Sequence, residues 1–211
     1  MYGVMLDGPY ITINSKKLVN FCSNDYLGIK QSKISNKQNQ SSSRLISGND
    51  KSFKIFEDKL SKHKSQENSL IFPTGYMTNL GVITTLIDKD DLVLSDEFNH
   101  ASLIEACKMC GAKISIFKHN NMDDLSNKIK QQKKRKFIIT EGVFSMDGDF
   151  SDMKTICEIS QKNNAIMILD DAHGDFTIGN DGKGTANHFK VSKKIDVYIS
   201  SLSKGLGSFG G

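Results

Sequence analysis

Short apolar runs alternate with stretches of helical periodicity over most of the chain. Runs of four to six apolar residues predict strands, and apolar residues spaced by three or four predict helices, as in 52–64, where Phe53, Phe56 and Leu60 share one face with His63. The predicted strands are 69–72, 92–95, 113–117, 136–140, 165–169 and 195–200, and the helices between them are 76–87, 101–110, 122–130 and 152–162. This alternation predicts an α/β fold in three layers, with helices on both faces of a largely parallel sheet.

The first fifty residues follow another pattern. Residues 9–22 predict two short strands around a turn at Asn14 and Ser15, and residues 31–43, rich in Ser, Asn, Gln and Lys, predict a polar loop. We therefore expect 1–50 to form an N-terminal segment of short strands and a loop, and 51–211 to form the large domain.

Composition narrows the class of protein. The chain has 211 residues, enough for one large domain with a full core, and its net charge of +4 is too small to indicate a nucleic-acid partner. No apolar run approaches the length of a membrane span, and the start does not resemble an export signal, so a cytoplasmic protein without a membrane partner is expected.

Four cysteines do not make a disulfide framework in a chain of this length. Cys107 and Cys110 form a C-x-x-C pair, but it lies in a predicted helix and no second Cys or His pair completes a zinc set. We expect buried thiols and no bound metal.

Reactive side chains follow the predicted strands at their carboxyl ends, where open parallel sheets bind ligands. Loops are polar anyway, but these residue types together suit one site. Thr74 and Gly75 follow the first strand, His100 the second, Glu141 and Ser145 the fourth, Asp170 and His173 the fifth, and Lys204 the sixth. We predict that Lys204, Asp170, His100 and His173 converge in one cleft.

Lys204 and Asp170 suggest what this cleft could hold. A desolvated lysine keeps part of its amine neutral and can attack a carbonyl, and a poorly solvated carboxylate needs a cationic partner. A lysine for a Schiff base and an aspartate for a pyridinium nitrogen are the groups that pyridoxal phosphate (PLP) needs. Two alternatives remain: Lys204 could be a solvated loop lysine, and Asp170 with Asp171 could be a structural or magnesium-binding pair.

Other residues fit the same cofactor and also have simpler interpretations. The glycine of 74–76, at the start of a helix, could let backbone N–H groups bind a phosphate, although Thr74 could simply cap the helix. His100 could stack on an aromatic cofactor or move a proton, or it could cap a helix. His63, His119 and His188 are expected to be packing or capping residues.

Gly205, Gly207 and Gly210 match the G-x-G-x-x-G pattern of dinucleotide-binding proteins. The sequence stops at Gly211, before the helix and the acidic residue that the pattern needs. We interpret these glycines as backbone freedom beside Lys204, and a Rossmann-like nucleotide-binding module stays as the alternative.

Several motifs, in this order along nearly the whole chain, resemble those of the α-oxoamine synthases. These are PLP enzymes of the aspartate aminotransferase type, fold type I. The motifs are 23–28 (SNDYLG), 43–48 (SRLISG), 74–76 (TGY), 95–102 (SDEFNHAS), 141–148 (EGVFSMDG), 170–174 (DDAHG) and 201–204 (SLSK).

The resemblance implies a role for each matching residue. Lys204 would bind the cofactor covalently and act as a base, Asp170 would pair with the pyridine nitrogen, and His100 would stack on the ring. The remaining implied contacts are Ala172 with the other ring face, His173 and Ser145 with the ring hydroxyl, Thr74, Gly75, Tyr76 and Ser201 with the phosphate, and Asn24 with the substrate.

The implied reaction is decarboxylative condensation of an amino acid with an acyl-CoA or acyl carrier protein thioester, catalysed by a homodimer. The family branch of biotin biosynthesis, which joins L-alanine to a pimeloyl thioester, is favoured. The branch that transfers an acetyl group to glycine is the alternative.

Two departures from the family pattern matter. The glycine-rich stretch that precedes Ser43 in the family is here 39–42 (NQSS), and the family continues through the rest of the large domain and a C-terminal domain. The resemblance therefore implies a truncated large domain, expected to bind PLP weakly and to turn over no substrate. A non-catalytic PLP-binding fragment also stays open.

Overall fold

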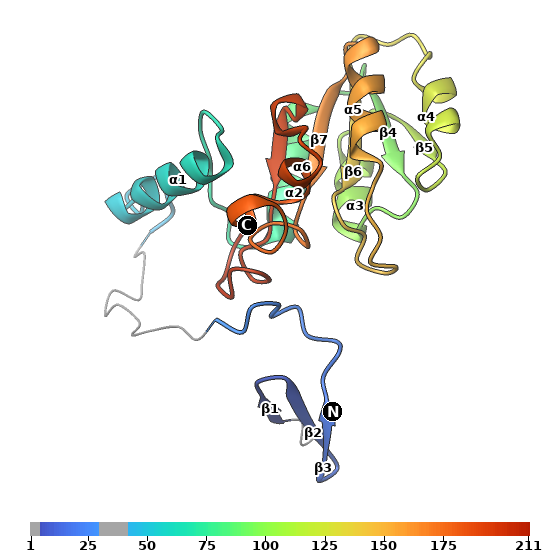
Figure 1. The fold of residues 1–211 in the computed structure, drawn as a ribbon. Helices are drawn as coiled ribbons and strands as arrows, with labels where there is room; N and C mark the ends of the chain where they lie inside the picture. Colours follow the sequence, from blue (N-terminus) through green and yellow to red (C-terminus); the bar gives the residue numbers. More distant parts are fainter. Residues whose placement is uncertain (1–4, 30–41) are drawn as a thin grey trace.

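A sheet of five parallel strands forms the centre of the molecule in the computed structural model, which describes residues 5–29 and 42–211 (Figure 1). The strand order is β5-β4-β6-β7-β8, and every neighbouring pair is parallel. The strands are β4 (Leu92–Asp96), β5 (Lys113–Phe117), β6 (Lys136–Glu141), β7 (Ile166–Asp170) and β8 (Val197–Ile199).

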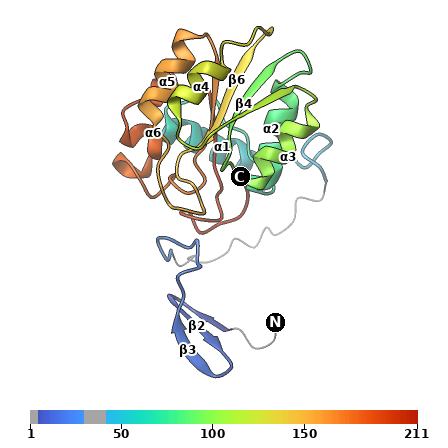
Figure 2. The ribbon, with the colours of Figure 1, turned by 90° about the vertical axis from the view of Figure 1, so that its right-hand side faces the viewer.

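Helices cover both faces of this sheet. Figure 2 shows α4, α5 and α6 on one face and α2 and α3 on the other, which confirms the predicted three-layer α/β fold. The helices are α1 (Lys51–Lys64), α2 (Gly75–Leu86), α3 (Ala101–Met109), α4 (Met122–Lys128), α5 (Met153–Lys162) and α6 (Thr185–His188), with short 3₁₀ turns η1 (Asn180–Gly182) and η2 (Ser192–Lys194).

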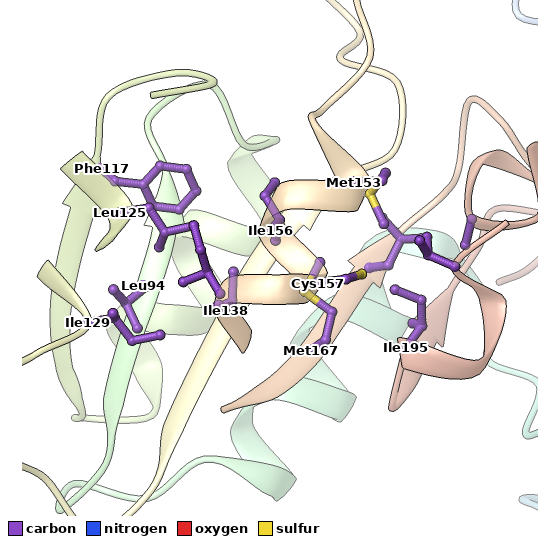
Figure 3. Packing of buried hydrophobic residues seen from close by; sticks show 14 of the residues in the cluster. Leu94, Phe117, Leu125, Ile129, Ile138, Met153, Ile156, Cys157, Met167 and Ile195 are labelled. Carbon is purple, nitrogen blue, oxygen red and sulfur yellow. The ribbon is translucent and has the colours of Figure 1, made fainter. Parts of the chain in front are cut away.

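The strands read as continuous apolar runs because each face of the sheet has its own core. Successive side chains point to opposite faces, so Leu94 and Ile138 pack toward α4 and α5, whereas Val93 and Ile139 pack toward α2 and α3. Figure 3 shows the cluster on the side of α4 and α5, in which Phe117 and other apolar side chains pack between the sheet and the helices. This packing fixes the carboxyl ends of the strands as a rigid edge.

The predicted strand 69–72 is wrong. Only Phe72 has a backbone partner there, exchanging hydrogen bonds with Gly211 (Phe72 N to Gly211 O, 2.8 Å; Gly211 N to Phe72 O, 3.0 Å). A strand needs a neighbour along its length, and among the described residues none lies beside 69–71. The last strand is also shorter than predicted, because Ile195 still belongs to the end of η2.

The N-terminal segment contains three antiparallel strands where two were predicted: β1 (Met5–Asp7), β2 (Tyr10–Ile13) and β3 (Lys16–Val19). The predicted turn is present, since Asn14 and Ser15 both have positive φ (49° and 63°), as a two-residue hairpin turn requires. This small sheet lies apart from the α/β body in Figures 1 and 2. Most of the predicted polar loop 31–43, and nearly all of the departure at 39–42, lie outside the described residues.

Neither membrane insertion nor cysteine chemistry gains support from the described residues. No helix among them is long and apolar enough to cross a bilayer. The cysteines are free, and burial raises the pKa of the Cys107 thiol to about 12, so that thiol is unreactive at neutral pH.

His119 joins the end of β4 to the loop between β6 and α5. Its Nδ1 lies 2.9 Å from Asp96 Oδ1, its Nε2 lies 2.8 Å from Asp149 Oδ2, and the ring stacks on Phe98. Burial alone would lower the pKa of the imidazole, but the hydrogen bonds with the two carboxylates outweigh it and raise the pKa above 6.5. His119 is thus a packing residue, and it favours the folded state when protonated.

This arrangement predicts a pH-dependent part of the stability. Because the folded-state pKa is raised, the stabilisation is complete below pH 6.5 and is lost as the pH rises through the folded-state pKa. We expect the free energy of unfolding in urea to fall by about 1 kcal/mol over that interval. His119→Gln should remove most of this change, whereas His63→Gln should keep it. An unchanged pH profile in His119→Gln would show that the ion pairs contribute nothing.

Candidate active site

A cavity of about 230 Å³ opens at the carboxyl ends of β6, β7 and β8, between the first turns of α2 and α3. It collects residues from five separate stretches of the sequence. All but two of the predicted site residues line it: Thr74, Gly75, Tyr76, His100, Asp170, Ala172, His173, Ser201 and Lys204. The predicted convergence of Lys204, Asp170, His100 and His173 is therefore present in the structure.

Lys204 lies in the loop after β8 and turns its amine toward His173, with Nζ 2.7 Å from Nε2. Burial lowers the pKa of this amine, while the negative charges of Asp170 and Glu141 oppose the shift. A larger share of the amine is therefore neutral than in a solvated lysine. This is the property that a lysine nucleophile or base requires.

His173 connects Lys204 to the N-terminal segment. Its Nδ1 lies 2.6 Å from the Tyr26 hydroxyl, which in turn donates to Asn24 Oδ1 at 3.2 Å. Burial lowers the pKa of His173 to about 4, helped by the charges of Lys204 and His100, so the ring is neutral at neutral pH. Asn24 does not line the cavity; among the described residues, it is linked to the cavity through Tyr26 and His173.

The Asp170 carboxylate is buried and held by two uncharged donors. Oδ1 accepts from the backbone N–H of Ala172 (3.0 Å) and Oδ2 from Nδ2 of Asn79 (2.8 Å). Among the described residues, no lysine or arginine lies within ion-pair distance of this carboxylate. A buried carboxylate with only neutral partners can hold a cationic ligand.

Asp171 serves a different purpose, although it is adjacent in sequence. Its oxygens accept from Oγ1 (2.7 Å) and N (2.8 Å) of Thr185, with Lys64 Nζ at 3.9 Å. A Cβ on Gly142, Gly174 or Gly184 would lie within 2.4 Å of these oxygens, so the chain packs tightly around the carboxyl group. Burial raises its pKa to about 7 against the opposing charge of Lys64.

The two aspartates therefore do not form a shared metal site. Among the described residues, no group of three or more His, Cys, Asp or Glu side chains is placed to hold a metal ion. The structural interpretation fits Asp171, and the cationic-partner interpretation fits Asp170.

An anion site lies at the start of α2. Thr74 caps the helix by accepting from Met77 N (3.1 Å). Among the described residues, none accepts from the backbone N–H groups of Gly75 and Tyr76. A Cβ on Gly75 would lie 3.2 Å from Ser201 Cβ, so glycine allows this close approach. The hydroxyls of Ser201 and Ser203, 2.9 Å apart, lie beside it. Free N–H groups at a helix N-terminus with adjacent hydroxyls suit a phosphate.

Ser145 is the other predicted residue that the cavity does not include. It is exposed and lines a neighbouring cavity of about 420 Å³, together with Tyr26, Phe144 and Thr177. His173 borders both cavities. Ser145 therefore lines a different cavity from Lys204, and His173 borders them both.

Several residues of the site were given no role from the sequence. Glu141 pairs in register with Asp170, and its carboxyl group accepts from His100 N; burial first, and Asp170 second, raise its pKa to about 8. Its place after a strand was a visible signal. Asn79, Ser102 and Ser203 also line the cavity, but only the fold shows it. Tyr26 could have been found from its motif, 23–28.

Comparison with known proteins agrees with this geometry. The family model described as aminotransferase class I and II matches residues 16–211. The chain belongs to this family. Its relatives include 8-amino-7-oxononanoate synthase of Thermoanaerobacter pseudethanolicus, 39% identical over 217 residues and covering 97% of the chain and 55% of that protein. Another is 8-amino-7-oxononanoate synthase 1 of Bacillus subtilis, 34% identical, covering 98% of the chain and 56% of that protein.

Two solved structures have the same fold as this chain. Serine palmitoyltransferase of Sphingomonas wittichii superposes with a TM-score of 0.93 at 28% identity, over 100% of the chain and 57% of that protein. A variant of the S. paucimobilis enzyme, solved with a bound PLP–myriocin aldimine, gives a TM-score of 0.92 at 26% identity and the same coverage. The chain thus spans little more than half the length of these relatives. The fold type I architecture and the resemblance to the α-oxoamine synthases are confirmed.

Membership of the aminotransferase family leaves no role for the dinucleotide pattern. Gly207 N donates to Lys204 O (3.0 Å), and a Cβ on Gly205 would lie 2.8 Å from Asp175 O. These glycines fold the loop tightly beside Lys204, as interpreted from the sequence.

The different surroundings of the two aspartates predict different effects on stability. Asp171→Ala leaves two buried donors of Thr185 without an acceptor and should lower the free energy of unfolding by about 3 kcal/mol. Asp170→Ala also removes the acceptor of Asn79 and Ala172, but it relieves the desolvation of a carboxylate that has no lysine or arginine within ion-pair distance among the described residues. The two effects offset each other, so the cost should be about 1 kcal/mol or less. Urea unfolding at pH 7 measures both. Equal losses would mean that Asp170 is as structural as Asp171.

Proposed function

We propose that the chain binds PLP in the 230 Å³ cavity and belongs to an enzyme that condenses an amino acid with an acyl thioester. One observation carries the proposal. A desolvated lysine amine, a buried carboxylate without a protein cation and a helix N-terminus with free N–H groups face the same small cavity. Each group matches one part of PLP: the aldehyde, the ring nitrogen and the phosphate.

The residues present fit this cofactor. Gly75 supports the fit most directly, because its missing side chain lets the phosphate-binding turn approach Ser201. In the proposal, Lys204 holds the aldehyde carbon, Asp170 the ring nitrogen and His173 the ring hydroxyl, while His100 and Ala172 lie against the ring faces. The phosphate would be held by the N–H groups of Gly75 and Tyr76 and by Ser201, on a turn capped by Thr74.

PLP supplies an aldehyde that forms a bond with an amine and a cationic ring that withdraws electrons from the substrate. The chain supplies the rest. Asp170 keeps a positive charge on the ring nitrogen favourable, because its carboxylate is shielded from water. Lys204 would be the base for the substrate proton, since burial keeps part of its amine neutral.

For the substrates we propose L-alanine and a pimeloyl thioester, carried by CoA or an acyl carrier protein. The curated relatives named 8-amino-7-oxononanoate synthase are 34–39% identical, whereas the superposed serine palmitoyltransferases are 26–28% identical. Transfer of an acetyl group to glycine stays as the alternative. Among the residues that line the cavity, Lys204 is the only lysine or arginine, so no second cation is present there for a substrate carboxylate.

We further propose a homodimer in which 1–50 acts as a separate segment and 51–211 as the PLP-binding domain. The small sheet β1-β2-β3 exposes Tyr10, Leu18 and Val19, and three short strands without a covered face gain little stability alone. A second copy would cover them. A cytoplasmic location stays a prediction.

Lys204→Ala tests the cofactor site. The 211-residue chain mixed with PLP should develop a visible absorbance band, and after borohydride reduction PLP should stay attached to the peptide that contains Lys204. Lys204→Ala should lower this attachment by at least about tenfold. Lys193→Ala, at an exposed lysine, should leave it unchanged. Attachment that persists in Lys204→Ala would place the cofactor elsewhere.

Asp170→Asn tests the reaction without a complete turnover. With PLP and L-alanine in D₂O, the chain should exchange the alanine Cα proton, and Asp170→Asn should slow this exchange by about 10²–10³-fold while altering PLP affinity less. Asp147→Asn, at an exposed position, is the control. NMR of the amino acid measures the exchange.

Parallel samples with other amino acids decide the substrate. Faster exchange with glycine would favour the alternative reaction, and faster exchange with L-serine would favour a reaction like that of serine palmitoyltransferase. We expect no thiol release from acyl-CoA by this chain, because the site lacks a second cation. Absence of exchange with every amino acid would contradict the proposed chemistry.

A further inference from the structure

A buried chain of hydrogen bonds joins Asp170 to His100 across the back of the cavity. Asn79 Nδ2 lies 2.8 Å from Asp170 Oδ2 and 2.8 Å from Ser102 Oγ, and Ser102 Oγ lies 2.7 Å from His100 Nδ1. Asn79 and Ser102 are 3% and 1% exposed, so water does not compete for these bonds. These hydrogen bonds link the end of β7 to α2 and to the start of α3.

The two ends of this series of hydrogen bonds set the direction of the bonds between them. At one end is the Asp170 carboxylate, which can only accept, and at the other is the Ser102 backbone N–H, which can only donate. A carboxylate only accepts, so the amide nitrogen of Asn79 must face Asp170, and its second N–H points at the Ser102 oxygen. The backbone N–H of Ser102 donates to His100 Nδ1 at 3.2 Å, so Nδ1 is an acceptor. The Ser102 hydroxyl, whose oxygen accepts from Asn79, then donates its own hydrogen to the same Nδ1.

The unpaired oxygen of Asn79 supports this direction. Asn79 Oδ1 is buried and has no hydrogen-bond partner among the described residues. Turning the amide over would satisfy nothing at that place and would set Oδ1 against the Asp170 carboxylate. The two donated bonds therefore fix the amide.

We propose that Asn79 and Ser102 are positioning residues that hold His100 as a neutral ring with its proton on Nε2. Two donors, the Ser102 hydroxyl and the Ser102 backbone N–H, point at Nδ1, so Nδ1 carries no proton. Both the tautomer with its proton on Nδ1 and the charged ring would disrupt these hydrogen bonds. Among the described residues, none is hydrogen-bonded to Nε2, which leaves that N–H available to a ligand of the cavity.

The value of this arrangement rests on the proposed function. A neutral imidazole can lie against a cationic cofactor ring, whereas a charged one would repel it in a site of low dielectric constant. The same hydrogen-bond chain starts at Asp170, so one asparagine orients both the proposed partner of the ring nitrogen and the ring that lies against the cofactor.

The test reads the protonation of His100 directly, in the 211-residue chain without PLP, so it does not depend on cofactor binding. Long-range ¹H–¹⁵N spectra distinguish a protonated from an unprotonated ring nitrogen, and the spectrum of His100→Gln assigns the signals. Wild type should show Nδ1 unprotonated and Nε2 protonated. A protonated Nδ1 in wild type overturns the proposal by itself.

Asn79→Asp reverses the hydrogen bond between residue 79 and Ser102 with little change in the shape of the side chain. Whether the carboxyl group at position 79 is ionised or carries a proton toward Asp170, it offers the Ser102 hydroxyl an acceptor. The Ser102 oxygen then becomes an acceptor for Nδ1–H, and the ratio of Nδ1-protonated to Nδ1-unprotonated ring should rise about tenfold. An unchanged ratio would contradict the proposal.

Two further variants complete the test. Asn99→Asp makes the same change at an equally buried asparagine beside His100 in sequence, which donates to Ser95 and Ile139 and not to the ring. It should leave the His100 signals as in wild type. If Asn79→Asp does not fold, as judged by circular dichroism, Ser102→Ala decides: it removes one of two donors and should raise the Nδ1-protonated share, and no rise would overturn the proposal.

Discussion

The removal of charged groups from water at the end of β7 is the constraint on which the rest of the site depends. Two neighbouring carboxyl groups, Asp170 and Asp171, are both buried, and the fold treats them in opposite ways. Asp171 receives two donors from Thr185 and packs against three glycines, so it belongs to the framework. Asp170 accepts hydrogen bonds from neutral donors, and among the described residues no lysine or arginine forms an ion pair with it. Its carboxylate lines the cavity, where a cationic ligand could pair with it.

Desolvation also sets the protonation of the other groups in the cavity. It lowers the pKa of Lys204 and of His173 and raises the pKa of Glu141, so three titratable side chains can lie close together with less charge than their types suggest. The hydrogen bonds add direction to this. His173 is fixed between Lys204 and Tyr26, and His100 is fixed by Ser102 and Asn79. Both ring nitrogens of His173 are thus engaged, whereas among the described residues none is hydrogen-bonded to Nε2 of His100.

The longer relatives show how much of a related enzyme this chain covers. The chain matches the aminotransferase class I and II family along most of its length and spans about half of the 8-amino-7-oxononanoate synthases it resembles. Within that half lie the groups proposed to hold PLP, whereas a second cation for a substrate is absent from the cavity lining. The proposed half-reaction, proton exchange at an amino acid, therefore calls only on groups that line this cavity.

The sequence by itself determined the parallel α/β sheet, because buried strands with both faces covered read as continuous apolar runs between helical stretches. It also determined that Lys204, Asp170, His100 and His173 meet, since carboxyl ends of parallel strands share one edge. It could not exclude a strand at 69–72, because an apolar run pairs only if a neighbour is present. Only the tertiary structure decided that Asp170 and Asp171 differ, that Ser145 lines a different cavity from Lys204, and that Asn79 and Ser102 line the cavity of Lys204. Those outcomes depend on contacts between residues far apart in the chain, and the local pattern of apolar and polar residues does not predict such contacts.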